Sequence, residues 1–199
     1  MAAKRDVEIL RGLARRYAEM AAQPSQDEKR RLPYGGELAP PRPNIYGATR
    51  KELWGHFAAQ EMTLISPTMH EEFILEYQLP IMNCWGRTAY GCCEDLTSKI
   101  DMLRQVPNLR VIAVAPRADS ARCAEQIGRD YVLSWRPNPT NMICAGFDEA
   151  LIRRTIIEGL AKTQGCVRHI HLKDVETVQG DPTRMRRWVS LVKDVISKA

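Results

Sequence analysis

The second half of the sequence alternates between short apolar segments and amphipathic segments, and this rhythm limits the possible folds more than any other feature. Four segments have the length and composition of strands, at 87–94, 109–115, 131–137 and 167–174. Each is followed by a segment with helical periodicity or helix-capping residues, at 97–105, 120–128, 149–163 and 182–196. Strands and helices that alternate in this way form parallel sheets, so the sequence predicts an α/β fold of parallel βα repeats.

Local signals predict where several helices begin. A helix is expected over 49–62, with Thr49 as its cap, and a second over 66–79. The second has Ser66 at the N-cap and Pro67 at the first helical position, where the missing N–H costs nothing. Pro80 is expected to end or kink that helix. Downstream, Asp119 and Asp148 are the expected N-caps.

The first part of the chain has a different character. Residues 4–22 carry apolar side chains at helical spacing and charges on the other face, which predicts an amphipathic helix. The segment 23–48 then holds five of the twelve prolines and three glycines. We expect a helical arm over 1–32 and a linker over 33–48.

Composition narrows the functional class. The net charge of +5 is mild and the arginines cluster on helical stretches, a pattern of solvated helix faces rather than of a nucleic-acid protein. No apolar run approaches the roughly 20 residues that a membrane helix needs, and the first residues do not resemble a signal peptide. We therefore expect a cytoplasmic protein with no membrane or nucleic-acid partner. Its six cysteines, which form no C-x-x-C pair, should be free thiols.

Polar residues collect at the ends of three of the predicted strands. Because side chains alternate along a strand, residues can be sorted by parity, and one class is polar and ends in a charge: Tyr90, Cys92 and Glu94; Ser134 and Arg136; His169, His171 and Lys173. A parallel strand covered on both faces is usually apolar. Three charged ends therefore suggest a pocket lined by Glu94, Arg136 and Lys173, the two cations holding an anionic group. The alternative is a buried salt-bridge cluster.

The same parity class contains candidate metal ligands. His169 and His171 stand two apart on one predicted strand, a spacing that can bring two imidazoles to one metal ion, and Cys92 shares their parity. Thiolate and imidazole together suit zinc. The alternative is that Cys92 packs as a small apolar residue, as most lone cysteines do.

Several stretches together resemble a known family. The segments "SPTMHEEFILEYQLPI", "YGCCEDL", "NLRVIAVAPRAD", "SWRPNP" and "HLKDVETVQGDPTRMRRW" resemble the C-terminal half of uroporphyrinogen-decarboxylase-like proteins, in particular the branch found with corrinoid-dependent methyltransferases of anaerobic bacteria. The segment at 4–22 resembles the opening helix of the same proteins.

This resemblance implies a (β/α)8 barrel and a set of activities. The family's reactions are decarboxylation of tetrapyrrole acetates and methyl transfer to or from a corrinoid or a thiol, often with zinc. Here it implies Glu94, Arg136 and Lys173 as catalytic residues and Tyr90 and Asp174 as contacts of a corrinoid or tetrapyrrole. Cys92 and His171 are the implied metal ligands. The zinc-dependent members carry a His-x-Cys pair, which this sequence lacks.

The sequence is shorter than the family requires. A (β/α)8 barrel takes about 250 residues, whereas this chain has 199 and only four predicted strands. We expect residues 49–199 to form half of such a barrel, as in a family member without its middle portion. Two copies could then pair edge to edge as a homodimer, or the N-terminal segments could cover the open side of a monomer. The functional alternatives are a non-catalytic corrinoid- or tetrapyrrole-binding module, or a decarboxylase-like activity.

Overall fold

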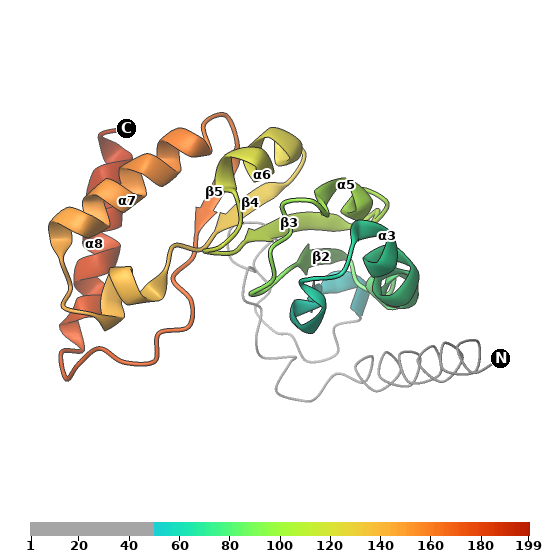
Figure 1. Cartoon of the computed structure of the whole chain (residues 1–199), viewed down its shortest axis with the longest axis horizontal. Helices are drawn as coiled ribbons and strands as arrows, with labels where there is room; N and C mark the ends of the chain where they lie inside the picture. The colour runs from blue at the N-terminus through green and yellow to red at the C-terminus, as the bar shows by residue number, and fades with distance from the viewer. Residues whose placement is uncertain (1–49) are drawn as a thin grey trace.

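A five-stranded parallel sheet forms the centre of the protein. The structure, a computed structural model, describes residues 50–199, so the predicted arm at 1–32 and the predicted linker at 33–48 both lie outside it. The strands lie in the order β1-β2-β3-β4-β5, and every neighbouring pair is parallel (Figure 1). They are β1 (Trp54–Phe57), β2 (Arg87–Tyr90), β3 (Leu109–Val114), β4 (Val132–Trp135) and β5 (Val167–Ile170). The prediction of an α/β fold with parallel βα repeats is confirmed.

Strand β1 occupies a segment for which the sequence predicted a helix, and that prediction is wrong. Only short 3-10 turns flank the strand, η2 (Arg50–Glu52) and η3 (Gln60–Met62). The segment pairs in register with β2, from Trp54 opposite Arg87 to Phe57 opposite Tyr90. Pairing with a distant strand has overridden the local helical preference, so the described sheet has five strands where the sequence indicated four.

The helix predicted after Ser66 is present and runs further than expected. It comprises α3 (Pro67–His70), a π-helical turn η4 (Glu71–Leu75) and α4 (Glu76–Met82). The Ser66 hydroxyl accepts a hydrogen bond from the Met69 N–H, which confirms the predicted cap. Pro80 lies inside α4, and the helix ends two residues later.

The remaining helices follow the predicted order. They are α5 (Ile100–Leu103), α6 (Ser120–Ile127), a π-helical turn η5 (Thr140–Cys144) that the sequence did not indicate, α7 (Glu149–Lys162) and α8 (Thr183–Ser197). The Asp119 carboxylate accepts hydrogen bonds from the first N–H groups of α6, and Asp148 caps α7 in the same way. Both predicted N-caps are therefore confirmed.

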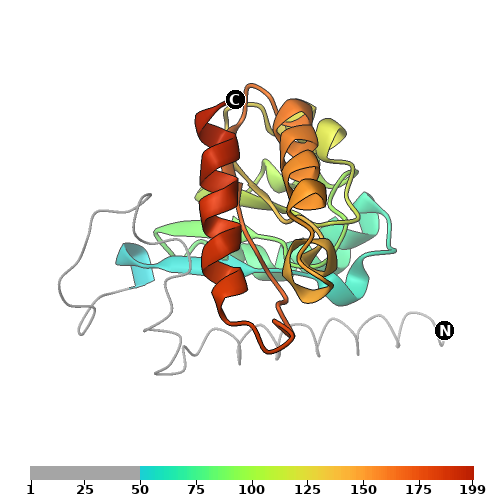
Figure 2. The same ribbon diagram turned by 90° about the vertical axis from the view of Figure 1, so that its left-hand side faces the viewer.

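The helices lie along one side of the sheet, and the main core fills the space between (Figure 1). Strand residues that face this core include Ile112, Val114, Leu133 and Trp135, while α7 and α8 lie side by side at the β5 end (Figure 2). The other face of the sheet carries a smaller buried cluster of Trp54, Ala89 and Val111. Among residues 50–199, no helix is both long and apolar enough to cross a lipid bilayer.

Helix α7 lies unusually close to the Trp135 ring at the end of β4. A Cβ added at Gly159, in the last turn of α7, would overlap the six-membered part of the Trp135 ring. The absence of a side chain at position 159 therefore lets α7 sit directly on β4. This contact fixes the helix that precedes β5.

Candidate functional site

Main-chain hydrogen bonds beyond the strand ends position the residues of the candidate site. The N–H of Gly91 donates to the Phe57 carbonyl at 2.8 Å, that of Arg136 to Val114 at 3.0 Å, and that of His171 to Trp135 at 2.9 Å. Each bond extends the parallel ladder one step past its strand. The residues that follow β2, β4 and β5 therefore start from one edge of the sheet, the edge where parallel α/β folds gather their sites.

A sharp turn at Gly91 directs residues 92–94 away from the path of β2. Gly91 has a φ of 100°, a region that favours glycine, and a Cβ there would lie 2.7 Å from the Leu96 Cδ1 and 3.0 Å from the Ala113 Cβ. Strand alternation therefore ends at this residue. We call residues 91–94 the cysteine loop.

Glu94 stabilises the cysteine loop through hydrogen bonds to main-chain N–H groups. Its side chain is only 2% exposed, and its two oxygens accept hydrogen bonds from the Ala59 N–H at 2.8 Å and the Cys92 N–H at 2.7 Å. A carboxylate that accepts two main-chain N–H bonds stabilises the backbone that it holds. Glu94 thereby joins the segment after β1 to the segment after β2.

Arg136 and His56 fasten the same loop through its carbonyls. Arg136 is 3% exposed, and its Nη1 donates to the carbonyl of Cys92 at 2.6 Å and to that of Gly91 at 3.4 Å. The His56 Nε2 lies 3.0 Å from the Gly91 carbonyl, so this nitrogen carries the proton and donates it. Burial lowers the pKa of His56 against the opposing effect of this hydrogen bond, and the nearby Arg136 lowers it further.

Two sulfurs and an ammonium group meet at the outer side of the cysteine loop. The Lys173 Nζ lies 2.7 Å from the Cys93 Sγ, 3.7 Å from the Cys92 Sγ and 2.8 Å from the Asp174 carboxylate. The two sulfurs are 3.7 Å apart, and Cys93 is exposed while Cys92 is half-buried. Burial lowers the pKa of Lys173, but Asp174 and Cys93 outweigh it and the net pKa is raised. Lys173 is therefore a cation at neutral pH.

Asp174 holds a backbone conformation that few non-glycine residues adopt. Its φ is 52°, and its carboxylate is more than half exposed while it pairs with the buried Lys173. Such backbone strain is frequent at functional sites. Here it turns the carboxylate back towards the preceding lysine.

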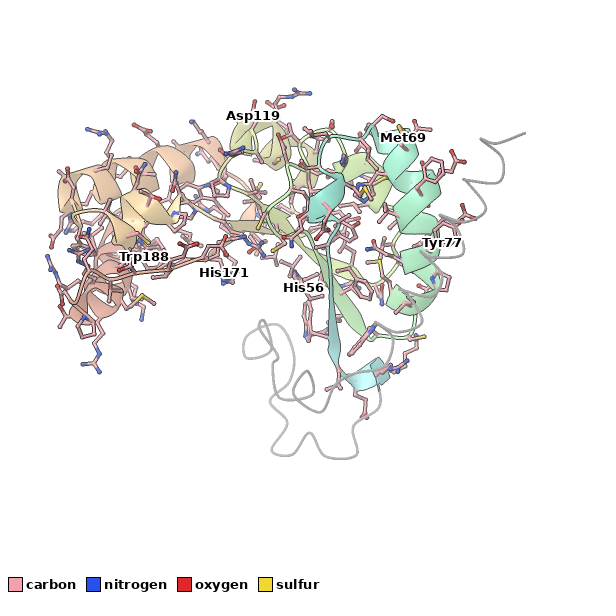
Figure 3. All side chains as sticks on the ribbon, turned by 60° about the horizontal axis from the view of Figure 1, so that its bottom comes forward. His56, Met69, Tyr77, Asp119, His171 and Trp188 are labelled. Carbon is pink, nitrogen blue, oxygen red and sulfur yellow. The ribbon has the colours of Figure 1, made fainter. Side chains whose placement is uncertain are left out.

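His169, in β5, and His171, directly after β5, form a separate group on the face of the sheet away from the helices. The His169 Nδ1 lies 3.2 Å from the Ser134 Oγ, and the rings of His169 and His171 meet edge to face at 5.4 Å between centroids. Burial, followed by Arg136, lowers the pKa of His171 to about 4. Figure 3 shows His171 and His56 on the same side of the sheet, opposite to Asp119.

These residues do not fit a zinc centre. Within residues 50–199, no group of three or more His, Cys, Asp or Glu side chains is placed to hold a metal ion. The Cys92 sulfur contacts Cys93 and Lys173, and a lysine ammonium beside the two sulfurs would repel a divalent cation. Cys92 and His171, the expected ligands, are therefore not assembled into a metal site.

Tyr90 faces the helices, and the parity expected for it is wrong. It is fully buried in the main core, where its hydroxyl donates to the Gln78 Oε1 at 2.8 Å and lies 2.7 Å from the His70 Nε2. Polar partners from α3 and α4 make this orientation possible for a tyrosine. Sequence parity assumed that a polar strand residue avoids the helix layer.

The structure thus brings together most of the predicted site residues. Cys92 and Glu94 are part of the cysteine loop, and Arg136, Lys173 and Asp174 contact it. His171 lies near Arg136, whereas Tyr90 faces the helices.

Sequence reasoning missed two residues of this site. His56 lies in a segment that the sequence predicted as a helix, and Cys93 falls outside the parity class that contains Cys92 and Glu94. The repeated cysteine itself was the available signal for Cys93. No protein-family model matches the chain, and no curated protein matches it at a significant level.

Proposed function

We propose that the described residues belong to a (β/α)8-type barrel of the uroporphyrinogen-decarboxylase-like kind, as the sequence resemblance implied. The strand order supports this proposal. In a doubly wound sheet the order of the strands reverses at a switch point, whereas the described strands follow one another in chain order. Right-handed crossovers that always step in one direction put every helix on one face, which is the arrangement of a barrel wall.

We further propose that the protein transfers methyl groups through the Cys93 sulfur. The observation that carries this proposal is the 2.7 Å contact between the exposed Cys93 Sγ and the Lys173 Nζ. The thiolate is the nucleophilic form of cysteine, and an adjacent ammonium group stabilises it. The Asp174 carboxylate holds that ammonium in place. The cytoplasmic location is part of this proposal, because the nucleophile must stay reduced.

The residues next to the cysteine loop suit a large, flat, partly apolar methyl donor such as a corrinoid. Leu64 is 95% exposed and Met62 is 41% exposed. Their segment is tied to the residues after the loop, because the Lys99 Nζ donates to the Met62 carbonyl and the Asp95 N–H to the Thr63 hydroxyl. A methylated corrinoid supplies, when bound, a methyl carbon whose bond to cobalt breaks with the electron pair remaining on the metal.

In this proposal each residue of the chain has a separate task. Cys93 loses its thiol proton to solvent and forms the new sulfur–carbon bond, while Lys173 stabilises the thiolate before the transfer. Glu94 and Arg136 act as positioning residues, because both hold the main chain of the cysteine loop. No zinc ion takes part.

Methylation of the protein by methylcobalamin tests this proposal. The full chain is incubated with methylcobalamin under anaerobic conditions, and the intact mass and the peptide that contains residues 92–93 are analysed. We expect a mass gain of one methylene group located on Cys93, absent from Cys93→Ser and retained in Cys84→Ser, which removes another exposed cysteine. Methylation of Cys84 instead, or no methylation at all, would refute the role of Cys93.

The lysine has its own matched control. Lys173→Met should slow methylation about fivefold or more, the effect of losing a cation a few ångströms from the sulfur. Arg186→Met removes an exposed helix arginine and should leave the rate nearly unchanged. Equal effects of the two substitutions would indicate diffuse surface charge.

A second candidate is a corrinoid- or tetrapyrrole-binding module without turnover. The use of both Glu94 and Arg136 for main-chain contacts favours it over a decarboxylase, which needs charged groups directed at its substrate. Corrinoid binding measured by spectroscopic titration, without methylation of Cys93, would support this second candidate.

A further inference from the structure

The adjacent pair Cys92 and Cys93 has properties that methyl transfer through one sulfur does not use. All six cysteines lie within the described residues and are free thiols, and these two are the ones whose sulfurs contact each other, at 3.7 Å. One sulfur is exposed and the other half-buried, so the pair opens towards solvent on one side. Two thiols held in this way can both bind to one atom.

A direct disulfide is an unfavourable outcome for this pair. Neighbouring Cα atoms are about 3.8 Å apart across a trans peptide, whereas disulfides usually span about 4.4–6.8 Å. A strained disulfide is readily reduced. The pair therefore persists as two thiols, and a bridging atom between the sulfurs would relieve the strain that a direct bond creates.

The surroundings of the pair select the kind of bridging atom. Zinc needs about four ligands, and within residues 50–199 no third His, Cys, Asp or Glu completes such a set. A metal ion that binds two sulfurs in a linear arrangement lies between them, and the sulfurs of neighbouring cysteines are too close together for that arrangement. A pyramidal, thiophilic centre that takes two sulfurs on one side needs only what this pair offers.

We propose that Cys92 and Cys93 form a dithiol site for trivalent arsenicals that carry one organic group and two exchangeable oxygen positions. The reaction is a ligand exchange without oxidation or reduction. Each sulfur replaces one arsenic–oxygen bond by an arsenic–sulfur bond. The two thiol protons leave with the displaced oxygen as water, and the product is a ring that contains arsenic and both sulfurs.

The environment also orders the two steps. The Cys93 sulfur is exposed and lies 2.7 Å from the Lys173 ammonium, so it reacts first. Burial raises the pKa of Cys92, followed by the contact with Cys93, so its thiol stays protonated until the arsenic is already held beside it. The second bond then forms within the cysteine loop, where its effective concentration is high.

Phenylarsine oxide is the probe for this site, because it offers two exchangeable positions and no more. The reduced full chain is titrated with it, and free thiols, intact mass and the modified peptide are measured. We expect one arsenical per chain, the loss of two thiols, and an adduct on the peptide that contains residues 92–93. The adduct should resist excess 2-mercaptoethanol and be removed by a small dithiol, since only a dithiol can replace both sulfurs.

Variants make the test specific. Cys92→Ser and Cys93→Ser should each lose the resistant adduct, whereas Cys84→Ser should keep it, and Lys173→Met should slow its formation about fivefold. A resistant adduct that survives in Cys93→Ser, or the loss of a single thiol per arsenical in the unaltered chain, would overturn the proposal. Peptide mapping of the unaltered chain gives an answer that does not depend on the folding of any variant. The result is independent of methylation by methylcobalamin, which needs one sulfur only.

Discussion

Acidification should destabilise the protein through His70, a buried histidine on α3. Its ring is 0% exposed, and its Nε2 lies 2.7 Å from the Tyr90 hydroxyl. That hydroxyl donates its own proton to Gln78, so it accepts from His70, and the His70 Nε2 carries the hydrogen. Within the part of the chain that the structure describes, the buried Nδ1 has no hydrogen-bond partner. A second proton there would create a buried cation whose new N–H group has no acceptor among residues 50–199.

The size of the effect follows from the pKa. Burial, with a smaller contribution from the Lys99 ammonium, lowers the pKa of His70 from 6.5 to about 4. Between these values the unfolded chain binds a proton that the folded chain does not, so stability is complete above pH 6.5 and falls as the pH approaches 4. One pH unit corresponds to about 1.4 kcal/mol, so His70 alone accounts for a loss of about 3 kcal/mol. His171, whose pKa burial also lowers to about 4, contributes in the same window.

Urea unfolding at a series of pH values from 7.5 to about 4 measures this loss. His70→Gln keeps a hydrogen-bond donor for Tyr90 and removes the titrating group, so the pH dependence should become clearly weaker, while the part due to His171 and His56 remains. Comparison of the two proteins at pH 7.5, where neither histidine titrates, separates this effect from the cost of the substitution itself. An unchanged pH slope in His70→Gln would refute the reasoning.

Three further predictions concern the cysteine loop, the core and assembly. Glu94→Gln should lower the free energy of unfolding by about 2 kcal/mol, because one of two main-chain N–H groups loses a charged acceptor. Glu61→Gln, at an exposed position, is the control, and equal urea midpoints for the two variants would contradict this prediction. Gly159→Ala should lower the free energy of unfolding by about 1–3 kcal/mol, because the added methyl group overlaps Trp135. Glu158→Ala, at an exposed position of the same helix, should change the melting temperature little, and equal melting temperatures for the two variants would exclude the close contact. Sedimentation at micromolar concentration should show a homodimer paired through sheet edges, and a monomer of 22.6 kDa would rule that assembly out.

The sequence predicted best what depends on neighbouring residues. The caps at Ser66, Asp119 and Asp148 are local hydrogen bonds between a side chain and the next turn, and all three form as expected. Parity was also right along β4, where Leu133 and Trp135 face the helices.

What the sequence could not supply depends on partners far along the chain. Strand β1 exists because it pairs with β2, and its four residues carry too weak a pattern to oppose the helical signal around them. Tyr90 faces the helices because His70 and Gln78 satisfy its hydroxyl there. Glu94 lies beyond the turn at Gly91, where alternation no longer applies, so its approach to Ala59 could not be inferred from strand parity.

The way the cysteine loop is fastened has a consequence for how this protein can change. Glu94, Arg136 and His56 hold the cysteine loop through the peptide groups of residues 91 and 92, so these contacts do not depend on the side chains at positions 92 and 93. Reactivity and scaffold are therefore separately encoded. Evolution or an engineer could exchange the two sulfurs for other reactive groups, and the frame would present each of them at the same place.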